Sequence, residues 1–257
     1  MNDIIIKPVR TSIIKPGDDI IKIITDSIKN IANNEDILVV SSKPILIAYN
    51  QLIDYRVVTA SRIAGELSKR YKLDPRVIEL IIRYSDRIYG GVPRFLLTDV
   101  NGVLIPNAGI DFKNIPNDKV SVLSISLLKE FAKNLYHHIY SNLRIKLGIV
   151  ISDSTIYPLR LGTRAIALVV YGFKPIRDYR GVSDLFGRCI EVTRLSLADE
   201  IASAAHLVIG EGSERIPAAI VKGLNIELEE GDFSEEIKLS QEECIYRLLF
   251  KRFEGEI

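Results

Sequence analysis

The sequence predicts a mixed α+β fold, in which sheets are flanked by helices. Apolar runs typical of strands and amphipathic patterns typical of helices follow one another along the 257 residues without a strict strand–helix–strand repeat. Between residues 95 and 106, two apolar runs flank Asn101 and Gly102, a pair that favours the type I′ turn of a β-hairpin. This hairpin requires that at least part of the sheet be antiparallel.

The first half of the chain contains two predicted strands and three predicted helices besides this hairpin. The strands span residues 3–9 and 36–42, and the helices span 16–32, 60–71 and 74–88. Asp18 and Asp19 stand at the start of the first helix, where a carboxylate can accept hydrogen bonds from free backbone N–H groups. Asp74 and Pro75 mark the start of the third helix as its N-cap and first helical residue.

The second half begins with a long predicted helix and then mixes strands with helices. The helix spans 124–144, strands span 147–152 and 165–173, a helix over 197–212 ends in glycine, and a final helix spans 240–253. Ser240 and Glu243 form a capping box for this last helix. We interpret residues 1–257 as a single unit, with two closely packed subdomains of about 1–146 and 147–257 as a possible division.

The composition indicates an ordinary globular protein, with 47% apolar and 26% charged residues. The formal net charge is +1, which gives no support to sequence-independent nucleic-acid binding. No apolar stretch approaches the roughly 20 residues that span a bilayer, so no membrane partner is expected. The first residues carry no signal-peptide pattern, and Cys189 and Cys244 form no CxxC pair. We therefore expect a cytoplasmic protein.

Three acids and one hydroxyl stand at the ends of apolar segments. Asp111 lies between Ile110 and Phe112, Asp153 and Ser154 come directly after the strand that begins at Leu147, and Glu211 lies between two glycines. Hard divalent cations prefer oxygen ligands, and Mg²⁺ combines a few carboxylates with water and substrate phosphates. The sequence therefore permits a metal site made of Asp111, Asp153, Ser154 and Glu211. Taken singly, each acid is more often a turn former or a helix cap.

Other local patterns narrow the choice of chemistry. The sequence contains no P-loop motif and no GxGxxG motif that opens a helix after a strand. His206 lies in the helix before the glycine loop, where a structural role is the simpler interpretation. In residues 178–188, Arg180 and Arg188 could bind a carboxylate or phosphate, or they could pair with Asp178 and Asp184 to hold a loop.

Several segments together resemble the coenzyme F-420-0:gamma-glutamyl ligases, a GTP-dependent family. The segments that carry the resemblance are "PGDD", "DILVV", "NAGID", "VISDS", "DYRGVSDLFGR", "EVTR", "LADEIASAA", "GEG" and "IPAAIVKGL". They occur in the order and rough spacing of that family from about residue 8 to residue 225, most densely over 147–223. The combination is specific, although no single segment is.

The resemblance implies a ligase-like fold and an amide-forming reaction. Such enzymes join L-glutamate to the carboxylate of the deazaflavin phosphodiester F-420-0 through an acyl phosphate made with GTP. The resemblance also implies Mg²⁺ or Mn²⁺, potassium as a further monovalent ion, and an intertwined homodimer. Asp111, Asp153, Ser154 and Glu211 match the positions that bind metal in the family.

The resemblance further implies a set of nucleotide-binding and substrate-binding residues. The nucleotide set comprises Thr11, Ser12, Ile13, Ile14, Ser42, Lys43, Asn114, Gly210, Gly212, Ser213 and Glu214, and the substrate set comprises Arg160, Arg180 and Arg188. Family members usually carry a Ser-Lys pair where this chain has Leu46 and Ile47. Lys43 lies four residues earlier and is the expected replacement, while Arg160 is the expected replacement for a family arginine that is absent here.

Two alternatives remain open from the sequence. One is a paralogous ligase that joins a different amino acid to a different acid. The other is a non-catalytic protein that binds a nucleotide or metabolite, which the loss of the family Ser-Lys pair would favour.

Overall fold

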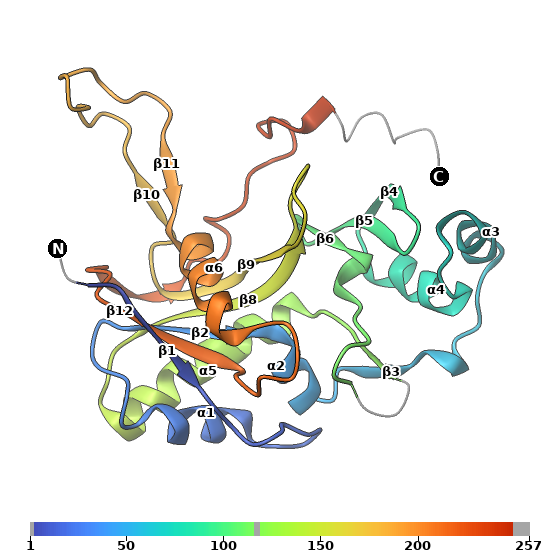
Figure 1. Cartoon of the computed structure of the whole chain (residues 1–257), viewed down its shortest axis with the longest axis horizontal. Coiled ribbons are helices and arrows are strands. Elements are labelled where there is room, and N and C mark those ends of the chain that lie inside the picture. Colours follow the sequence, from blue (N-terminus) through green and yellow to red (C-terminus); the bar gives the residue numbers. More distant parts are fainter. Residues whose placement is uncertain (1–2, 116–118, 249–257) are drawn as a thin grey trace.

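A six-stranded mixed sheet forms the centre of the computed structural model, which describes residues 3–115 and 119–248 (Figure 1). In spatial order its strands are β1 (Ile5–Val9), β12 (Ala218–Lys222), β2 (Ile37–Ser41), β8 (Gly148–Ile156), β9 (Thr163–Phe173) and β13 (Leu228–Asp232). β2 and β8 run parallel, and the other neighbours run antiparallel. The expectation of a mixed α+β fold is confirmed.

Helices cover both faces of this sheet. α6 (Leu197–Ile209) packs against β9, β12 and β1 on one face, and α5 (Ile125–Leu143) packs against β8 and β9 on the other (Figure 1). α1 (Ile20–Ile28) and α2 (Ser42–Ala48) pack against α5. In β2, Leu38 belongs to the core on the α5 side, whereas Val39 belongs to the core on the α6 side. Because both faces are covered, the strand is apolar throughout, as is typical of parallel pairs.

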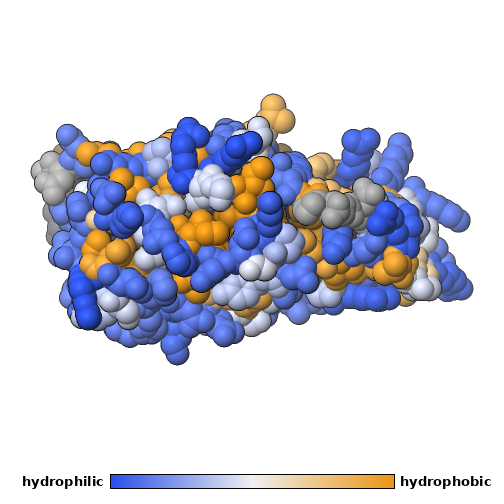
Figure 2. Space-filling model, turned by 90° about the horizontal axis from the view of Figure 1, so that it is seen from below, coloured by the Kyte–Doolittle hydropathy of each residue, from blue (hydrophilic) through white to orange (hydrophobic). Residues whose placement is uncertain are grey.

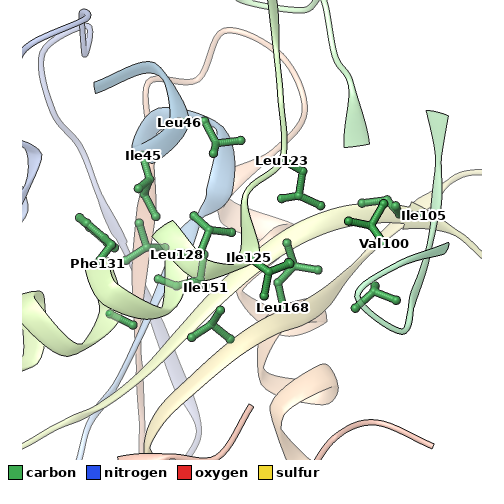
Figure 3. Close-up of a cluster of buried hydrophobic side chains, with 14 of the residues drawn as sticks. Ile45, Leu46, Val100, Ile105, Leu123, Ile125, Leu128, Phe131, Ile151 and Leu168 are labelled. Atoms are coloured by element: carbon green, nitrogen blue, oxygen red, sulfur yellow. The ribbon is translucent and has the colours of Figure 1, made fainter. Parts of the chain in front are cut away.

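The core on the α5 side extends to a smaller sheet (Figure 3). Phe131 and Leu128 of α5 lie near Ile45 of α2, while Leu123 and Ile105 continue the cluster toward the small sheet (Figure 3). That sheet consists of β4 (Arg87–Val92), β5 (Phe95–Val100) and β6 (Val103–Pro106), and it is flanked by α3 (Arg62–Tyr71) and α4 (Pro75–Tyr84). Shared apolar packing therefore joins the two sheets.

The Asn-Gly hairpin is present where the sequence predicts it. β5 and β6 are joined by Asn101 and Gly102, whose φ angles are 52° and 77°. Both residues take the left-handed conformation that a type I′ turn requires, and the pair is therefore confirmed as the turn.

Two further strand pairs and two short 3₁₀ turns complete the described chain. β3 (Leu52–Asp54) pairs with β7 (Lys119–Ser121), and β10 (Ile176–Asp178) pairs with β11 (Arg194–Ser196); the turns span Tyr55–Val57 and Asn107–Gly109. Residues 176–196, here called the arm, project away from the body of the molecule (Figure 1). The central sheet draws strands from both halves of the chain, so residue 146 is not a boundary between sheets.

Four predicted helices end differently in the structure, and one of them, expected over 197–212, ends at Ile209. The helix expected over 74–88 ends at Tyr84, because Arg87 and the residues after it pair with β5 as strand β4. The first helix ends at Ile28 and does not continue to residue 32. Of the final helix expected over 240–253, residues 241–246 contain turns, 247–248 are helical, and 249–253 lie outside the described residues.

Among residues 3–115 and 119–248, no helix combines the length and the apolar character needed to cross a bilayer. On the face drawn in Figure 2, hydrophobic side chains form separate patches between hydrophilic ones.

Candidate active site

A cavity of about 450 Å³ lies beyond the carboxyl end of β2, beside β8. The last residue pair between these parallel strands is Ser41 with Ser152, and beyond it β8 continues with β9 as its neighbour. The space next to this part of β8 is therefore open to side chains from other segments. The sequence-predicted residues that line it are Thr11, Ser12, Ile13, Ile14, Lys43, Asn114, Asp153, Ser154, Gly210, Glu211, Gly212, Ser213 and Glu214.

Asp153 and Ser154 lie inside a strand, and the expectation that they follow a strand is wrong. They belong to β8 and pair with Ile166 and Ala165 of β9. The hairpin with β9 extends the strand past the point where β2 ends. The ladder shifts register just before them, between Ile151 and Ser152. Such irregularities change the direction of nearby side chains, and here both residues line the cavity.

The carboxyl group of Asp153 is buried, and this changes its pKa. Burial of its carboxyl group raises its pKa to about 6, although the side chain as a whole keeps some exposure toward the cavity. The Ser154 N–H, the Lys43 charge and the hydroxyl of Ser42 oppose this rise in pKa, and the Asp111 charge adds to it. Ser42 is itself buried and is not among the residues that line the cavity, so its binding of nucleotide stays a prediction.

Lys43 enters the cavity from α2, a helix that the sequence analysis did not predict. Lys43 and Ile47 both line the cavity, and residues four apart lie on the same side of a helix. Ile47 stands where the family resemblance implies a lysine. Lys43 presents an ammonium group to the same cavity from one turn earlier, and its binding of nucleotide stays a prediction.

Asp111 lies just outside the cavity lining and is paired with this lysine. The Lys43 Nζ atom lies 2.5 Å from the Asp111 Oδ2 atom. Burial alone would raise the pKa of Asp111, but hydrogen bonds from the Lys113 N–H and from Lys43, with the Lys43 charge, hold that pKa below its ordinary value. The backbone of Asp111 bridges to Ser121, which fixes the loop after the turn Asn107–Gly109.

Glu211 belongs to a second group of polar side chains, which it forms with Thr163, His206 and Ser154. Its Oε1 atom accepts a hydrogen bond of 2.9 Å from the Thr163 hydroxyl and lies 3.1 Å from His206 Nε2. Burial raises the pKa of Glu211, but the Thr163 and Ser154 hydroxyls and the His206 and Lys113 charges lower it more, so the pKa lies below its ordinary value. The carboxylate is thus held in its charged form at neutral pH.

The glycine loop is shaped by one hydrogen bond within it and by another from a distant segment. Gly210 has φ +76°, and a Cβ atom at this position would lie 2.5 Å from the Glu214 carboxyl carbon. The Glu214 carboxylate accepts a hydrogen bond from the Gly212 N–H, and the Asn114 side chain donates to the Gly212 carbonyl at 2.9 Å. Glu214, predicted to bind nucleotide, therefore closes the loop in this structure.

The N-terminal segment, residues 11–14, also lines the cavity. The Thr11 N–H donates to the Arg215 carbonyl, which continues the contact between β1 and β12 beyond the ends of those strands. Residues 11–14 then pass beside the glycine loop and line the cavity.

The donor set suits a hard divalent cation that is completed by other ligands. Lys43 places one positive charge against Asp111 and also acts on Asp153, so a cation already lies beside these two acids. Within the described chain, no three acid, imidazole or thiol side chains gather closely enough to hold an ion by themselves. Mg²⁺ commonly keeps several waters and binds one or two carboxylates plus substrate phosphates, which this arrangement fits.

The three predicted substrate arginines lie outside the cavity lining. Arg180 pairs with Asp178 at 2.5 Å, and Asp184 accepts hydrogen bonds from the backbone of Phe186 and Arg188. Arg180 thus pairs with Asp178, as in the alternative in which these residues hold a loop. Arg160 is an exposed residue in the β8–β9 turn. Their binding of substrate stays a prediction.

Sequence reasoning missed Thr163, Lys113 and Ser152 and treated His206 as structural. Thr163 and His206 contact Glu211, Lys113 lies 3.9 Å from it, and Ser152 lines the cavity. Lys113 lies between Asp111 and Asn114 in sequence, and this position between two predicted site residues could have indicated that it lies near the site. Thr163 carried no local signal, because only the β8–β9 pairing brings it to Glu211.

Cavities of a few hundred cubic ångströms with convergent polar groups are typical of small-molecule sites. The fold and the cavity therefore define a class, the mixed α+β proteins with a small-ligand site at the end of a central strand. Comparison with known proteins makes this specific. The chain belongs to the F420-0:gamma-glutamyl ligase family, whose model matches residues 8–223.

Curated relatives agree with this assignment over most of their length. The chain is 34% identical to the coenzyme F420:L-glutamate ligase of Methanopyrus kandleri over 217 residues, which cover 84% of this chain and 85% of the relative. The enzyme of the same name from Archaeoglobus fulgidus is 32% identical over 241 residues, covering 93% and 94%. That of Methanosarcina mazei is 31% identical over 229 residues, covering 86% of each. These archaeal relatives are named as ligases.

Proposed function

We propose that this chain is a ligase that joins L-glutamate to the carboxylate of F420-0, using GTP and a divalent metal ion. The observation that carries the proposal is the convergence on one cavity of the predicted segments 11–14, 153–154 and 210–214, together with Lys43 and Asn114. These segments lie far apart in sequence. Membership of the ligase family supports the substrates, and the chemistry of the cavity supports the phosphate donor and the ion.

Amide formation requires an activated carboxylate, because a carboxylate and an ammonium ion do not condense favourably in water. In the proposed route a carboxylate oxygen of F420-0 attacks the γ-phosphorus of GTP, and GDP leaves. The glutamate amine, having lost a proton, then attacks the acyl-phosphate carbon and displaces inorganic phosphate. Each step transfers negative charge between oxygens, so groups that stabilise this charge accelerate it.

The residues of this chain supply positive charge and hydrogen-bond donors. Lys43 is positioned to donate to phosphate oxygens from α2, and the N–H groups of Glu211 and Ser213 belong to the loop that lines the cavity. Asn114 holds this loop through its hydrogen bond to Gly212. Asp111, Asp153, Ser154 and Glu211 would hold Mg²⁺ or Mn²⁺, which supplies charge neutralisation on the phosphates when bound.

We also propose that the protein forms a homodimer through the arm. Leu185 and Phe186 near the tip of the arm are 98% and 86% exposed, and Val182 and Val192 are exposed beside them. Large apolar side chains gathered on a projecting hairpin are typical of a surface that binds another protein. A second copy of the chain is the partner that the family resemblance implies.

The test of the reaction is GDP and phosphate release from GTP with F420-0, L-glutamate and Mn²⁺ or Mg²⁺. We expect release that depends on both acceptor substrates and on the ion, with a glutamylated product in equal amount. Release with other acids but not with F420-0 would support the paralogous ligase instead. Binding of GTP by calorimetry without any turnover would support the non-catalytic alternative.

A further inference from the structure

Lys43 occupies a position in the cavity where its charge contacts an acid of the metal set. Its ammonium nitrogen lies 2.5 Å from Asp111, and its side chain is 21% exposed against 35% for Asp111. Its charge also acts on the Asp153 carboxyl. One lysine therefore interacts with two of the acids to which the proposed function assigns the divalent ion.

The Lys43 ammonium group and a divalent ion compete for the Asp111 carboxylate, so each weakens the binding of the other. Two unit charges about 4 Å apart repel each other by roughly 1 kcal/mol in water, and an ammonium group and a divalent ion by about twice as much. The repulsion is larger in a protein environment. The Asp111 oxygen that contacts Nζ is one of the two through which this carboxylate could bind the ion. The lysine side chain has a flexible four-carbon stem, so it can leave this oxygen without unfolding the helix that carries it.

We propose that Lys43 is a tethered cation, which neutralises Asp111 in the free protein and moves to the nucleotide phosphates when the divalent ion binds. This inference rests on the proposed function. Lys43 lines the cavity, so phosphates bound there lie on the same side of α2 as its ammonium group. Binding of nucleotide would draw the lysine from Asp111 and free this acid for the ion. Nucleotide and metal binding would then favour each other through one side chain.

The test is the affinity of the full chain for Mn²⁺ without nucleotide, measured from the electron spin resonance signal of free Mn²⁺. We expect Lys43→Met to bind Mn²⁺ about fivefold more tightly than the wild type, because the competing cation is gone. Lys43→Gln should also bind Mn²⁺ more tightly than the wild type, and it replaces the methionine variant if that variant folds poorly. Lys43→Arg, which keeps the charge, should stay close to the wild type.

Lys113→Met is the matched control for the general loss of one positive charge near the site. Lys113 lies 3.9 Å from Glu211, which is also an acid of the proposed metal set, but its side chain is 64% exposed, so solvent screens its charge more than that of Lys43. We expect less than about a twofold change in Mn²⁺ affinity for this variant. A change as large as that of Lys43→Met, or an unchanged or weaker affinity in Lys43→Met, would overturn the inference.

The same variants separate this inference from the proposed function. Lys43→Met should bind GTP more weakly than the wild type, and its Mn²⁺ affinity should gain less from GTP. If turnover of the wild type requires no divalent ion, the proposed metal dependence fails and the inference falls with it. If turnover requires the ion but Lys43→Met binds Mn²⁺ no more tightly, the inference alone fails.

Discussion

Asn114 donates a hydrogen bond of 2.9 Å to the carbonyl oxygen of Gly212, a residue 98 positions further along the chain. This bond joins the loop after Asp111 to the glycine loop that follows α6. It therefore links the two segments that carry Asp111 and Glu211. The cavity depends on such bonds, because the glycine loop lines one part of it and segments distant in sequence line the rest.

We expect Asn114→Gly to weaken nucleotide binding while the fold persists. Asn114 has φ 58°, a conformation that glycine accepts, so the substitution removes the amide without backbone strain. The loss of one hydrogen bond of about 0.5–1.5 kcal/mol corresponds to roughly a two- to tenfold loss of GTP affinity by calorimetry. Asn50→Gly is the control, since Asn50 has φ 54° and does not line the cavity. Equal affinities in the two variants would contradict the role of Asn114.

Asp153→Asn should abolish phosphate release without unfolding the protein. The substitution keeps the shape of the side chain and removes the charge that the proposed metal site requires. We expect at least about a hundredfold loss of turnover, of the order seen when a group that stabilises transferred charge is removed. Circular dichroism and thermal melting establish that the variant is folded. Turnover close to that of the wild type would exclude Asp153 from the site.

The stability of the metal-free protein should fall between about pH 4 and pH 6 because of Asp153. Its pKa is raised from 3.8 to about 6 in the folded state, so the folded chain binds this proton more tightly than the unfolded chain. The stabilisation is present below the unfolded pKa and is lost as pH rises through the folded value. A shift of this size corresponds to at most roughly 3 kcal/mol.

The measurement is denaturant unfolding of the wild type and Asp153→Asn in the presence of a chelator. The difference between their free energies of unfolding should change across this pH window and stay constant above it. Asp111 and Glu211 titrate in both proteins, so taking the difference removes most of their contribution. A difference that is independent of pH would contradict the raised pKa of Asp153.

Gly210→Ala should distort the glycine loop and impair nucleotide binding. The added Cβ atom would lie 2.5 Å from the Glu214 carboxyl carbon, so the Glu214 side chain would have to leave the Gly212 N–H. The positive φ adds a further cost of about 1 kcal/mol. Gly162→Ala is the control, because Gly162 has φ +101° with open space around the added atom. We expect both variants to lose stability, and only Gly210→Ala to lose GTP affinity.

Leu185→Asp combined with Phe186→Asp should convert the proposed dimer to a monomer. Both side chains are almost fully exposed on the arm, so the change costs little in the isolated chain. Burial of the added charges in an interface would be strongly unfavourable. Light scattering after size-exclusion chromatography measures the mass. Leu159→Asp, at an exposed leucine in the β8–β9 turn, is the control, and a dimer that survives the arm substitutions would refute this interface.

Elements with a strong local pattern were predictable from the sequence. The helix expected over 124–144 is α5, and the hairpin around Asn101 and Gly102 is β5–β6. The glycine-ended helix is α6, with Gly210 as its C-cap. Each of these elements depends on interactions between residues that are close in sequence. Hydrophobic periodicity and the choice of turn residues therefore predict it.

Elements that depend on distant partners were not predictable in this way. α2 was missed because its seven residues follow directly on β2 and contain Pro44. The end of α4 was misplaced because Arg87 pairs with Asp99 of another strand. Asp153 and Ser154 were placed after a strand, since their polarity suggested a turn, whereas pairing with β9 keeps them in β8.

The sequence by itself determined the α+β class, the main helices and the family, because these follow from local patterns and from the order of motifs. Only the tertiary structure decided that Lys43 contacts Asp111 and that Glu211 contacts Thr163 and His206. The physical reason is that β2 ends before β8 does. This difference in strand length opens the space in which side chains from distant segments meet, and neither strand's own residues specify where the other ends.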